Sequence, residues 1–472
     1  MPVCTIDGKE IEFKSGENLV EVAKRGGIEI PVFCYHPGLS VVAQCRMCAV
    51  QIEKMPKLQT ACSTKAQEGM VVHTQTPQVK AARESVMEFL LINHPLDCPV
   101  CDKSGECDLQ DNSFDYGSAY MRTTESRRTY VDLDMGPVIQ KNMNRCIHCT
   151  RCIRFGDEVA EIREMVALNR GNHTEISTID GLPLATAYAG NYADICPTGS
   201  LTLKDFRFKK RVWYLTKGES ICEGCSRGCS MIVEHANGHV ERCRPKENLN
   251  VNRYWLCDEG RFLFRKYQES SRIVNPTAIE NRQKKEISWT EAIVKFRETL
   301  SKKGMILCGT DLTLEEMRLV QKFKEDYLSD VPVYTFGTQK ILTPEKDGNE
   351  DGILRMLSKT SNLHGVKQFP HFVPFQNIVS DTQVLWIFRG GRAELPEAVS
   401  SFKGKVIGIG VFFEELTQGT FLPGVNFLEK SGTVVNFQGL EQEFKRVVVP
   451  PQGCKPLSEV LMTLGRSKEK VS

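Results

Sequence analysis

The stretch NHPLDCPVCDKSGECDLQD (residues 93–111) sets one histidine beside three cysteines. His94 stands four residues before Cys98, and Cys98, Cys101 and Cys107 follow the spacing C-x2-C-x5-C. A helix is predicted from about residue 78 to residue 92, because apolar residues recur on one face and Pro95 lies just past its end. His94 is therefore expected to project from a helix terminus toward the cysteine loop.

The cysteine content divides the chain into two parts. Of the 19 cysteines among 472 residues, all but Cys308 and Cys454 lie before residue 258. In a reducing cytosol, such an excess indicates metal binding more often than disulfide bonds. We expect a series of small metal-binding modules followed by an ordinary globular domain.

The overall composition excludes several classes of protein. The 61 basic and 59 acidic residues leave no electrostatic footprint for nucleic acid or for an anionic membrane. The longest apolar runs fall far short of the roughly 20 residues that a spanning helix needs, and the start does not have the pattern of a signal peptide. We expect a soluble chain with no nucleic-acid partner that reaches a membrane only through partner subunits.

Fifteen cysteines and His94 form four groups of four. The first group has the spacing C-x10-C-x2-C-x13-C and consists of Cys34, Cys45, Cys48 and Cys62. Its long loop follows a predicted strand hairpin and a short helix (residues 19–24), which predicts a β-grasp [2Fe–2S] ferredoxin module. The alternative is a zinc site, although zinc ligands usually come as two short pairs.

The second group is His94, Cys98, Cys101 and Cys107. Three thiols leave one position of a [4Fe–4S] cluster without a ligand, and His94 is the predicted fourth. A neutral imidazole in place of a thiolate removes one negative charge, so the cluster potential should be higher, as in Rieske centres.

The third and fourth groups each predict one further [4Fe–4S] cluster. The third is Cys146, Cys149, Cys152 and, in a Cys-Pro pair, Cys196. His148 lies between two of these ligands and is predicted to face solvent or to lie behind them. The fourth has the spacing C-x2-C-x3-C-x27-C and consists of Cys222, Cys225, Cys229 and Cys257.

Three smaller features of the sequence bear on the ligand sets. Gly224 and Gly228 are expected to let the backbone approach the sulfurs of the fourth group. Cys4 and Cys243 have no partner set and are predicted to be packing residues. The chain also lacks a G-x-G-x-x-G dinucleotide motif, so one-electron transfer is expected here and a flavin on another polypeptide.

Residues 1–270 resemble the large iron–sulfur subunit of bacterial NADH:quinone oxidoreductase, respiratory complex I. The resemblance runs through AARESVMEFLLINHPLDCPVCDKSGECDLQD, RCIHCTRCIRF, CPTGSLT, FRFKKRVWYL and VNRYWLCDEGRF. It implies that the first three clusters carry electrons from a flavin subunit toward the quinone site and that the fourth lies off this path. The chain would then belong to a proton-translocating enzyme, without an NADH or quinone site of its own.

The same resemblance implies partners and a location. The expected partners are the flavin/NADH-binding subunit, a small [2Fe–2S] subunit and the quinone-proximal connecting subunits. The expected location is the cytoplasmic face of the inner membrane, as a peripheral subunit.

The expected architecture is a multidomain protein of α+β and α/β domains. GMILCGT, LTLEEMRLVQKFKEDYL and VPVYTFG predict strand–helix–strand, and residues 422–444 match the closing hairpin of molybdopterin oxidoreductases. The five predicted domains are a [2Fe–2S] β-grasp (1–77), a [4Fe–4S] domain with one histidine and three cysteine ligands (78–120), a ferredoxin-like [4Fe–4S] domain (121–215), a molybdopterin-oxidoreductase-type [4Fe–4S] domain (216–271) and a truncated molybdopterin-oxidoreductase-like α/β domain without molybdopterin (272–472).

Other enzyme classes share some of these motifs. A formate dehydrogenase commonly has Lys two residues after the last cluster cysteine, where this chain has Glu259, and it needs a metal-binding Cys or selenocysteine, for which Cys308 and Cys454 are poorly placed. The diaphorase subunit of an NAD-linked hydrogenase usually ends before the fourth group. An iron-only hydrogenase would need a further cysteine-rich block, and a structural or regulatory metal protein would not need four clusters in series.

Overall fold

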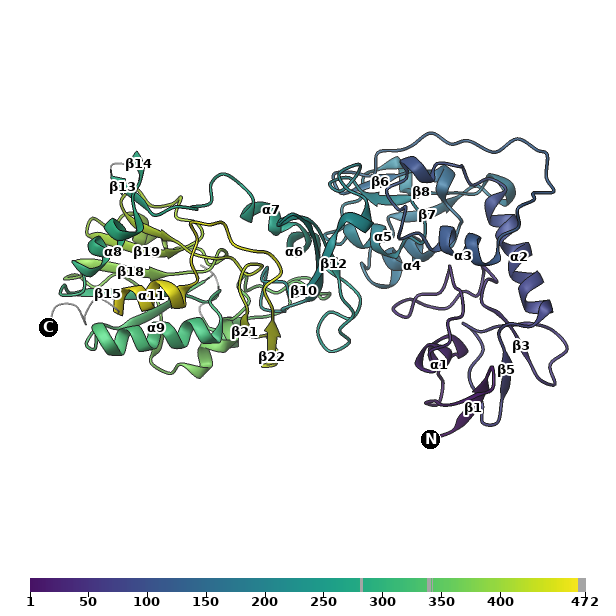
Figure 1. Ribbon diagram of the computed structural model, residues 1–472, viewed down its shortest axis with the longest axis horizontal. Helices are drawn as coiled ribbons and strands as arrows, with labels where there is room; N and C mark the ends of the chain where they lie inside the picture. The colour runs from purple at the N-terminus through teal and green to yellow at the C-terminus, as the bar shows by residue number, and fades with distance from the viewer. Residues whose placement is uncertain (281–282, 338–340, 342, 466–472) are drawn as a thin grey trace. The chain divides into compact units, whose positions relative to one another are not determined.

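The computed structural model in Figure 1 describes residues 1–280, 283–337, 341 and 343–465. The chain forms two compact units, Met1–Tyr214 and Leu215–Ser472, and both mix helices with strands. Among the described helices, none combines the length and the apolar character needed to cross a bilayer.

The first unit begins with a five-stranded sheet of order β2-β1-β5-β3-β4. Its elements are β1 (Val3–Ile6), β2 (Lys9–Glu12), α1 (Leu19–Arg25), β3 (Ala49–Ile52), β4 (Gln59–Thr60) and β5 (Val71–His73). Asp7 and Gly8 join β1 to β2 with φ of 47° and 81°, as a tight two-residue hairpin turn requires. Asn18 caps α1 by accepting two backbone N–H groups. The predicted hairpin and short helix are confirmed.

Two helices frame the segment that contains His94. They are α2 (Pro77–Leu91) and α3 (Asp108–Tyr116). The helix predicted over residues 78–92 is therefore confirmed, and it ends before Pro95. The buried guanidinium of Arg83 on α2 donates to the Ala49 carbonyl and to the Tyr116 hydroxyl, both at 3.1 Å, and so ties α2 to β3 and α3.

The rest of the first unit consists of two strand pairs and two short helices. The pairs are β6 with β9 and β7 with β8. The elements are β6 (Ile139–Lys141), α4 (Arg151–Glu158), β7 (Met165–Leu168), β8 (Glu175–Thr178), α5 (Gly190–Ile195) and β9 (Leu201–Leu203). Helices α4 and α5 pack against each other through the edge-to-face contact of Phe155 with Tyr192.

The second unit opens with an antiparallel sheet of order β10-β11-β12 and two short helices. These are β10 (Thr216–Ile221), β11 (Ser230–Ala236), β12 (His239–Pro245), α6 (Asp258–Phe262) and α7 (Phe264–Tyr267). Cys243 is buried within β12, as Cys4 is within β1, so both are packing residues as predicted.

An eight-stranded sheet of order β14-β13-β20-β19-β18-β15-β16-β17 forms the centre of the second unit. Its strands are β13 (Thr277–Glu280), β14 (Gln283–Glu286), β15 (Gly304–Gly309), β16 (Val333–Phe336), β17 (Phe372–Pro374), β18 (Val384–Phe388), β19 (Lys405–Gly410) and β20 (Gly419–Pro423). The six strands from β20 to β17 are mutually parallel. The predicted strand–helix–strand and α/β sheet are confirmed.

Helices and a separate hairpin complete this unit (Figure 1). They are α8 (Trp289–Arg297), α9 (Leu314–Tyr327), α10 (Glu397–Ser400), α11 (Leu457–Gly465), β21 (Gly432–Val435) and β22 (Glu441–Phe444). The closing hairpin predicted over residues 422–444 is shorter than expected, because its first residues belong to β20 in the large sheet.

The parallel strands bury both of their faces, as a sheet covered on two sides requires. Ile306, Cys308 and Trp386 pack with residues of α8, α9 and α11, whereas Leu307 and Ile387 face a second core. The alternation follows the period of two along each strand. Cys308 is thus a core residue, as predicted.

One substitution on the helical side of this core should strongly lower the free energy of unfolding. Phe296 on α8 is fully buried and lies 5.8 Å, between ring centroids, from Phe323 on α9. Phe296→Ala should lower the free energy of unfolding by about 3–5 kcal/mol, because the cavity cannot collapse. Urea unfolding of the full chain, followed by circular dichroism, measures this. Val294→Ala is the matched control on the same helix, since Val294 is 48% exposed, and equal effects of the two substitutions would contradict the described packing.

Candidate iron–sulfur sites

The four cysteines of the first set lie together in the loops beside β3 and β4. Cys48 directly precedes β3 and Cys62 follows β4. Hydrogen bonds from the Cys45 and Cys62 thiols lower the pKa of Cys34, and the same contacts raise the pKa of Cys45 and Cys62. Cys48 interacts with Cys62 in turn. The structure therefore brings all four predicted ligands of this set together.

The three cysteines of the second set lie on the loop between α2 and α3. Cys101 and Cys107 are buried and Cys98 is exposed. Burial raises the pKa of Cys101, and it raises the pKa of Cys107 to about 11. The charge of Cys98 acts on Cys101, and that of Cys101 acts on Cys107. The three thiols thus form one electrostatic group.

His94 lies close to this loop in sequence, but among the described residues no hydrogen bond joins its ring to the three thiols of the loop. Its Nδ1 is buried and has no hydrogen-bond partner among the described residues. Burial, reinforced by Arg145, lowers the pKa of the imidazole to about 4, so the ring is neutral at pH 7. The charged groups that act on it are Arg145, Asp97 and Arg127. The neutral ring and its unpartnered nitrogen suit a metal ligand, and the ligand role stays a prediction.

All four cysteines of the third set line one cavity. Cys146, Cys149 and Cys152 come from the loop before α4 and its first turn, and Cys196 follows α5 directly. Burial raises the pKa of Cys146 to about 12 and that of Cys149 to about 11. The segments that carry these residues are 44 residues apart, and the fold closes them around a common space.

The backbone of the third loop turns its N–H groups toward sulfur. His148 and Thr150 have φ of 54° and 59°, and the His148 N–H lies 3.3 Å from the Cys146 Sγ. Alternation of left- and right-handed residues makes concave N–H surfaces that are found at many iron–sulfur sites. The His148 ring is paired with the Thr174 carbonyl at 2.9 Å, and its predicted place, facing solvent or behind the ligands, stays a prediction.

The fourth set is buried in the second unit. Its cysteines Cys222, Cys225, Cys229 and Cys257 are each 8% exposed or less. Burial raises the pKa of all four, and their mutual charges add to the effect on several of them. They therefore lie together, although Cys257 is far from the others in sequence.

Two glycines lie against sulfurs of this set, and only one of them was predicted from the sequence. A Cβ on Gly224 would lie 3.3 Å from the Cys222 Sγ, which confirms the expected close approach. A Cβ on Gly228 would instead meet the Gln442 side chain, and Gly228 is needed for its φ of 67°. Gly260, which sequence reasoning missed, approaches the sulfurs of both Cys222 and Cys257.

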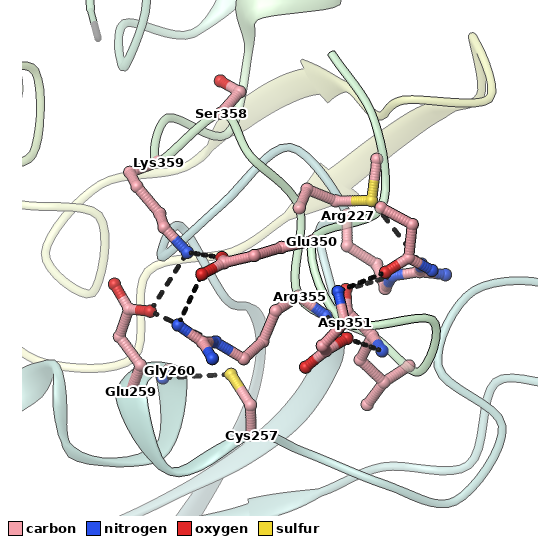
Figure 2. A network of polar contacts seen from close by, with 12 residues as sticks. Arg227, Cys257, Glu259, Gly260, Glu350, Asp351, Arg355, Ser358 and Lys359 are labelled. Atoms are coloured by element: carbon pink, nitrogen blue, oxygen red, sulfur yellow. Dashed lines mark hydrogen bonds and ion pairs between the residues drawn. The ribbon is translucent and has the colours of Figure 1, made fainter. Parts of the chain in front are cut away.

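An ion-pair network covers the helix that follows Cys257 (Figure 2). Glu259 pairs with Lys359 at 3.3 Å and with Arg355 at 3.9 Å, and it also contacts Arg392. Glu350 pairs with Lys359 and Arg355 at 2.7 and 3.0 Å. The carboxylate that stands where formate dehydrogenases have Lys is thus fully engaged by cations of the α/β domain.

Sequence reasoning also missed the arginines that connect the loops of the first unit. Arg211 donates to the Cys101 carbonyl at 2.6 Å, and Arg145 pairs with Asp97 at 2.8 Å. Arg151 and Arg154 donate to carbonyls of the first and third loops. For Arg151 and Arg154, the only sequence signal was their place in RCIHCTRCIRF, where they lie on either side of Cys152.

The donor chemistry of the sets suits iron–sulfur clusters. Thiolates, with an occasional imidazole, are the usual ligands of such clusters. Among the residues that the structure describes, no three Cys, His, Asp or Glu side chains are arranged to hold a single metal ion. The assignment of clusters accordingly rests on the donor types, their spacing and their burial.

Four parts of the chain match families of iron–sulfur domains. Residues 3–77 match the 2Fe-2S iron-sulfur cluster binding domain, and residues 83–122 match the NADH-ubiquinone oxidoreductase-G iron-sulfur binding region. Residues 136–202 match the NADH-quinone oxidoreductase subunit 3 ferredoxin-like domain, and residues 215–268 match the molybdopterin oxidoreductase Fe4S4 domain. The predicted presence of [2Fe–2S] and [4Fe–4S] binding domains is confirmed, and each ligand set falls inside one of these ranges.

Curated relatives match over 55–74% of the chain. The G subunit of NADH-quinone oxidoreductase from Rickettsia bellii (strain RML369-C) is 42% identical over 325 residues, which are 68% of this chain and 47% of the relative. The NADH-ubiquinone oxidoreductase 75 kDa subunit of Reclinomonas americana is 39% identical over 354 residues, 74% of this chain and 51% of the relative. The chain spans about half the length of these curated relatives.

Solved structures also match part of the chain, among them a hydrogenase. It is a chain of an NAD+-reducing [NiFe]-hydrogenase in the H2-reduced state, with a TM-score of 0.41 and 28% identity, and the match covers 45% of this chain and 91% of that one.

The second set depends on a close approach at Gly199. A Cβ there would lie 2.1 Å from the Cys101 Sγ, so Gly199→Ala should displace this ligand. The purified chain should then lose about four irons, the content of one cube. Gly348→Ala is the control, because its Cβ would meet only a Leu357 methyl at 3.7 Å. Unchanged iron content in Gly199→Ala, measured by a colorimetric iron assay, would show that Cys101 is not a ligand in this position.

Proposed function

We propose that this chain relays single electrons in the peripheral arm of NADH:quinone oxidoreductase. As its motifs predicted, the chain is a homologue of the large iron–sulfur subunit of NADH-quinone oxidoreductase. The observation that carries the proposal is a shared core in the first unit. Cys34, Cys107 and Cys149, one from each of its three sets, pack into a single apolar cluster with Phe33, Met47 and Ile147. One core thus holds one predicted ligand of each of the three sets.

Direct hydrogen bonds also join the second and third sets. The Asp108 N–H donates to the Pro197 carbonyl at 3.1 Å, and the Cys107 Sγ lies 3.6 Å from the same oxygen. Lys103 donates to the Ala193 carbonyl at 3.2 Å, just before the Cys-Pro pair. Neighbouring sets are therefore held by short, buried contacts, as an electron relay requires.

The proposed ligands are the sixteen residues of the four sets. Cys34, Cys45, Cys48 and Cys62 would hold a [2Fe–2S] cluster, and the other three sets, with His94 as the one nitrogen ligand, would each hold a [4Fe–4S] cluster. Such clusters, when bound, exchange one electron at a time. The chain's own residues supply the thiolates, exclude water from most of them and donate backbone N–H groups to sulfur.

The activity with NADH and quinone would require other subunits. We propose as partners a flavin/NADH-binding subunit, a small [2Fe–2S] subunit and quinone-proximal connecting subunits, in a proton-translocating assembly at the cytoplasmic face of the inner membrane. The domain after residue 271 is proposed to be a molybdopterin-oxidoreductase-like scaffold without molybdopterin. The capture of Glu259 by three cations supports this, since those cations then do not face a cofactor.

Metal analysis of the native assembly tests the proposal. The chain, purified anaerobically, should contain about fourteen iron atoms, two from the [2Fe–2S] cluster and twelve from the three [4Fe–4S] clusters. A flavin subunit should co-purify, and molybdenum should not be stoichiometric. Nickel in the assembly would favour the hydrogenase alternative, and stoichiometric molybdenum would favour the formate dehydrogenase alternative. Zinc in the four cysteine sets would reject iron–sulfur chemistry altogether.

The His94 ligand is tested by exchange for a thiol. His94→Cys should retain a four-iron cluster and lower its midpoint potential, because a thiolate adds one negative charge and disfavours the reduced state. An EPR-monitored redox titration measures the shift. His173→Cys, on the exposed segment after β7, adds a thiol away from the set and should leave every potential unchanged. An unshifted potential in His94→Cys would remove His94 from the ligand set.

A further inference from the structure

Helix α4 carries a buried guanidinium that contacts two predicted cluster loops at once. The Arg154 Nη2 donates to the Cys34 carbonyl at 2.6 Å and to the Cys149 carbonyl at 3.2 Å. Its Nη1 donates to the Ser40 carbonyl in the first loop. A single side chain therefore connects a ligand of the first set to a ligand of the third, although the two cysteines are 115 residues apart in sequence.

A second arginine on the same helix repeats the connection. Arg151 donates to the Tyr35 carbonyl at 2.6 Å and to the Ile195 carbonyl at 3.1 Å. Tyr35 follows Cys34 and Ile195 precedes Cys196. In addition, the Gln44 side chain donates to the His148 carbonyl at 2.8 Å, which joins the same two loops by an uncharged contact.

The charge of Arg154 has no carboxylate partner among the described residues, although its side chain is only 7% exposed. Arg151 has one at 3.8 Å, in Asp108. Burial of an unpaired cation is costly unless negative charge is nearby. The cysteines of the first and third sets would supply such groups as cluster-bound thiolates, because Arg154 contacts the main chain of both Cys34 and Cys149. The cations are thus placed to face groups that gain negative charge.

We propose that Arg154, assisted by Arg151, is the positioning residue that couples the first and third cysteine sets for electron exchange. The inference rests on the proposed electron-relay function. When one electron passes between the groups held by these two sets, one is oxidised by one electron and the other is reduced by one, and no proton moves. The guanidinium remains protonated throughout, so its charge stabilises the reduced form on either side. Its hydrogen bonds to the Cys34 and Cys149 carbonyls fix the separation of the loops and form a short path between these two residues.

Two substitutions of Arg154 separate the effect of its charge from the effect of its hydrogen bonds between the two loops. Arg154→Gln removes the charge, whereas Arg154→Lys keeps the charge but loses the planar guanidinium whose two nitrogens reach the Ser40 carbonyl and the Cys34 and Cys149 carbonyls. Arg163→Gln is the control, since Arg163 is a surface residue whose side chain is 85% exposed. Each variant is prepared in the full chain with its iron content measured first, so that wild-type material without iron would reject the proposed function itself.

The readouts are the midpoint potentials of the four clusters and the magnetic interaction between the first and third when both are paramagnetic. Arg154→Gln should lower the potentials of the first and third sets and leave the other two unchanged. Arg154→Lys should keep both potentials, yet weaken the magnetic interaction and slow electron exchange in freeze-quench EPR. Wild-type potentials and interaction in Arg154→Gln at full iron content would overturn the proposal. So would loss of iron in both variants, which would make the arginine's role only structural.

Discussion

Hydrogen bonds from buried arginines to main-chain carbonyls hold the cysteine loops in place, and the geometry of the predicted ligand sets depends on them. A loop that wraps a cluster has little regular secondary structure, so its carbonyls lack partners in a helix or sheet. Buried carbonyls must nevertheless be paired. Arginine suits this task because one planar side chain carries five donors. Buried Arg154 and half-buried Arg211 meet this need in the loops of the first and second sets, and buried Arg83 donates to the carbonyl of Ala49, directly after Cys48.

The same arginines change the electrostatics of the sites. Four thiolates in one set concentrate negative charge, and their burial disfavours that charge further. A cation that pairs with a surface carboxylate would not offset it, whereas one that donates only to carbonyls keeps its full charge for the sulfurs. Arg154 meets this description among the described residues. Structural support and charge compensation therefore come from one side chain.

The fourth set obtains its support from the α/β domain instead. The Ser226 N–H donates to the Ser358 carbonyl at 3.2 Å, the Phe437 N–H donates to the Ser226 carbonyl at 2.8 Å, and Gln442 donates to the Gly228 carbonyl at 3.0 Å. Residues more than one hundred positions later thus complete the loop that carries Cys222, Cys225 and Cys229. The network of Glu259 with Lys359, Arg355 and Arg392 attaches the helix after Cys257 to the same domain. These contacts support the proposed scaffold role of this domain.

Sequence reasoning succeeded where a property depends on spacing along the chain. It found the helix before His94 and the strand hairpin because period and turn chemistry are local, and it assigned Cys196 and Cys257 to their distant sets by ligand count. It missed Arg154 and Gly260, since Arg154 also contacts Cys34 and Gly260 also approaches Cys222, which lie far away in sequence and come close only in the fold. His94 falls between these cases. Its distance from Cys98 along the chain suggested a ligand, whereas the electrostatic setting of its ring depends on Arg145, which the local pattern does not contain.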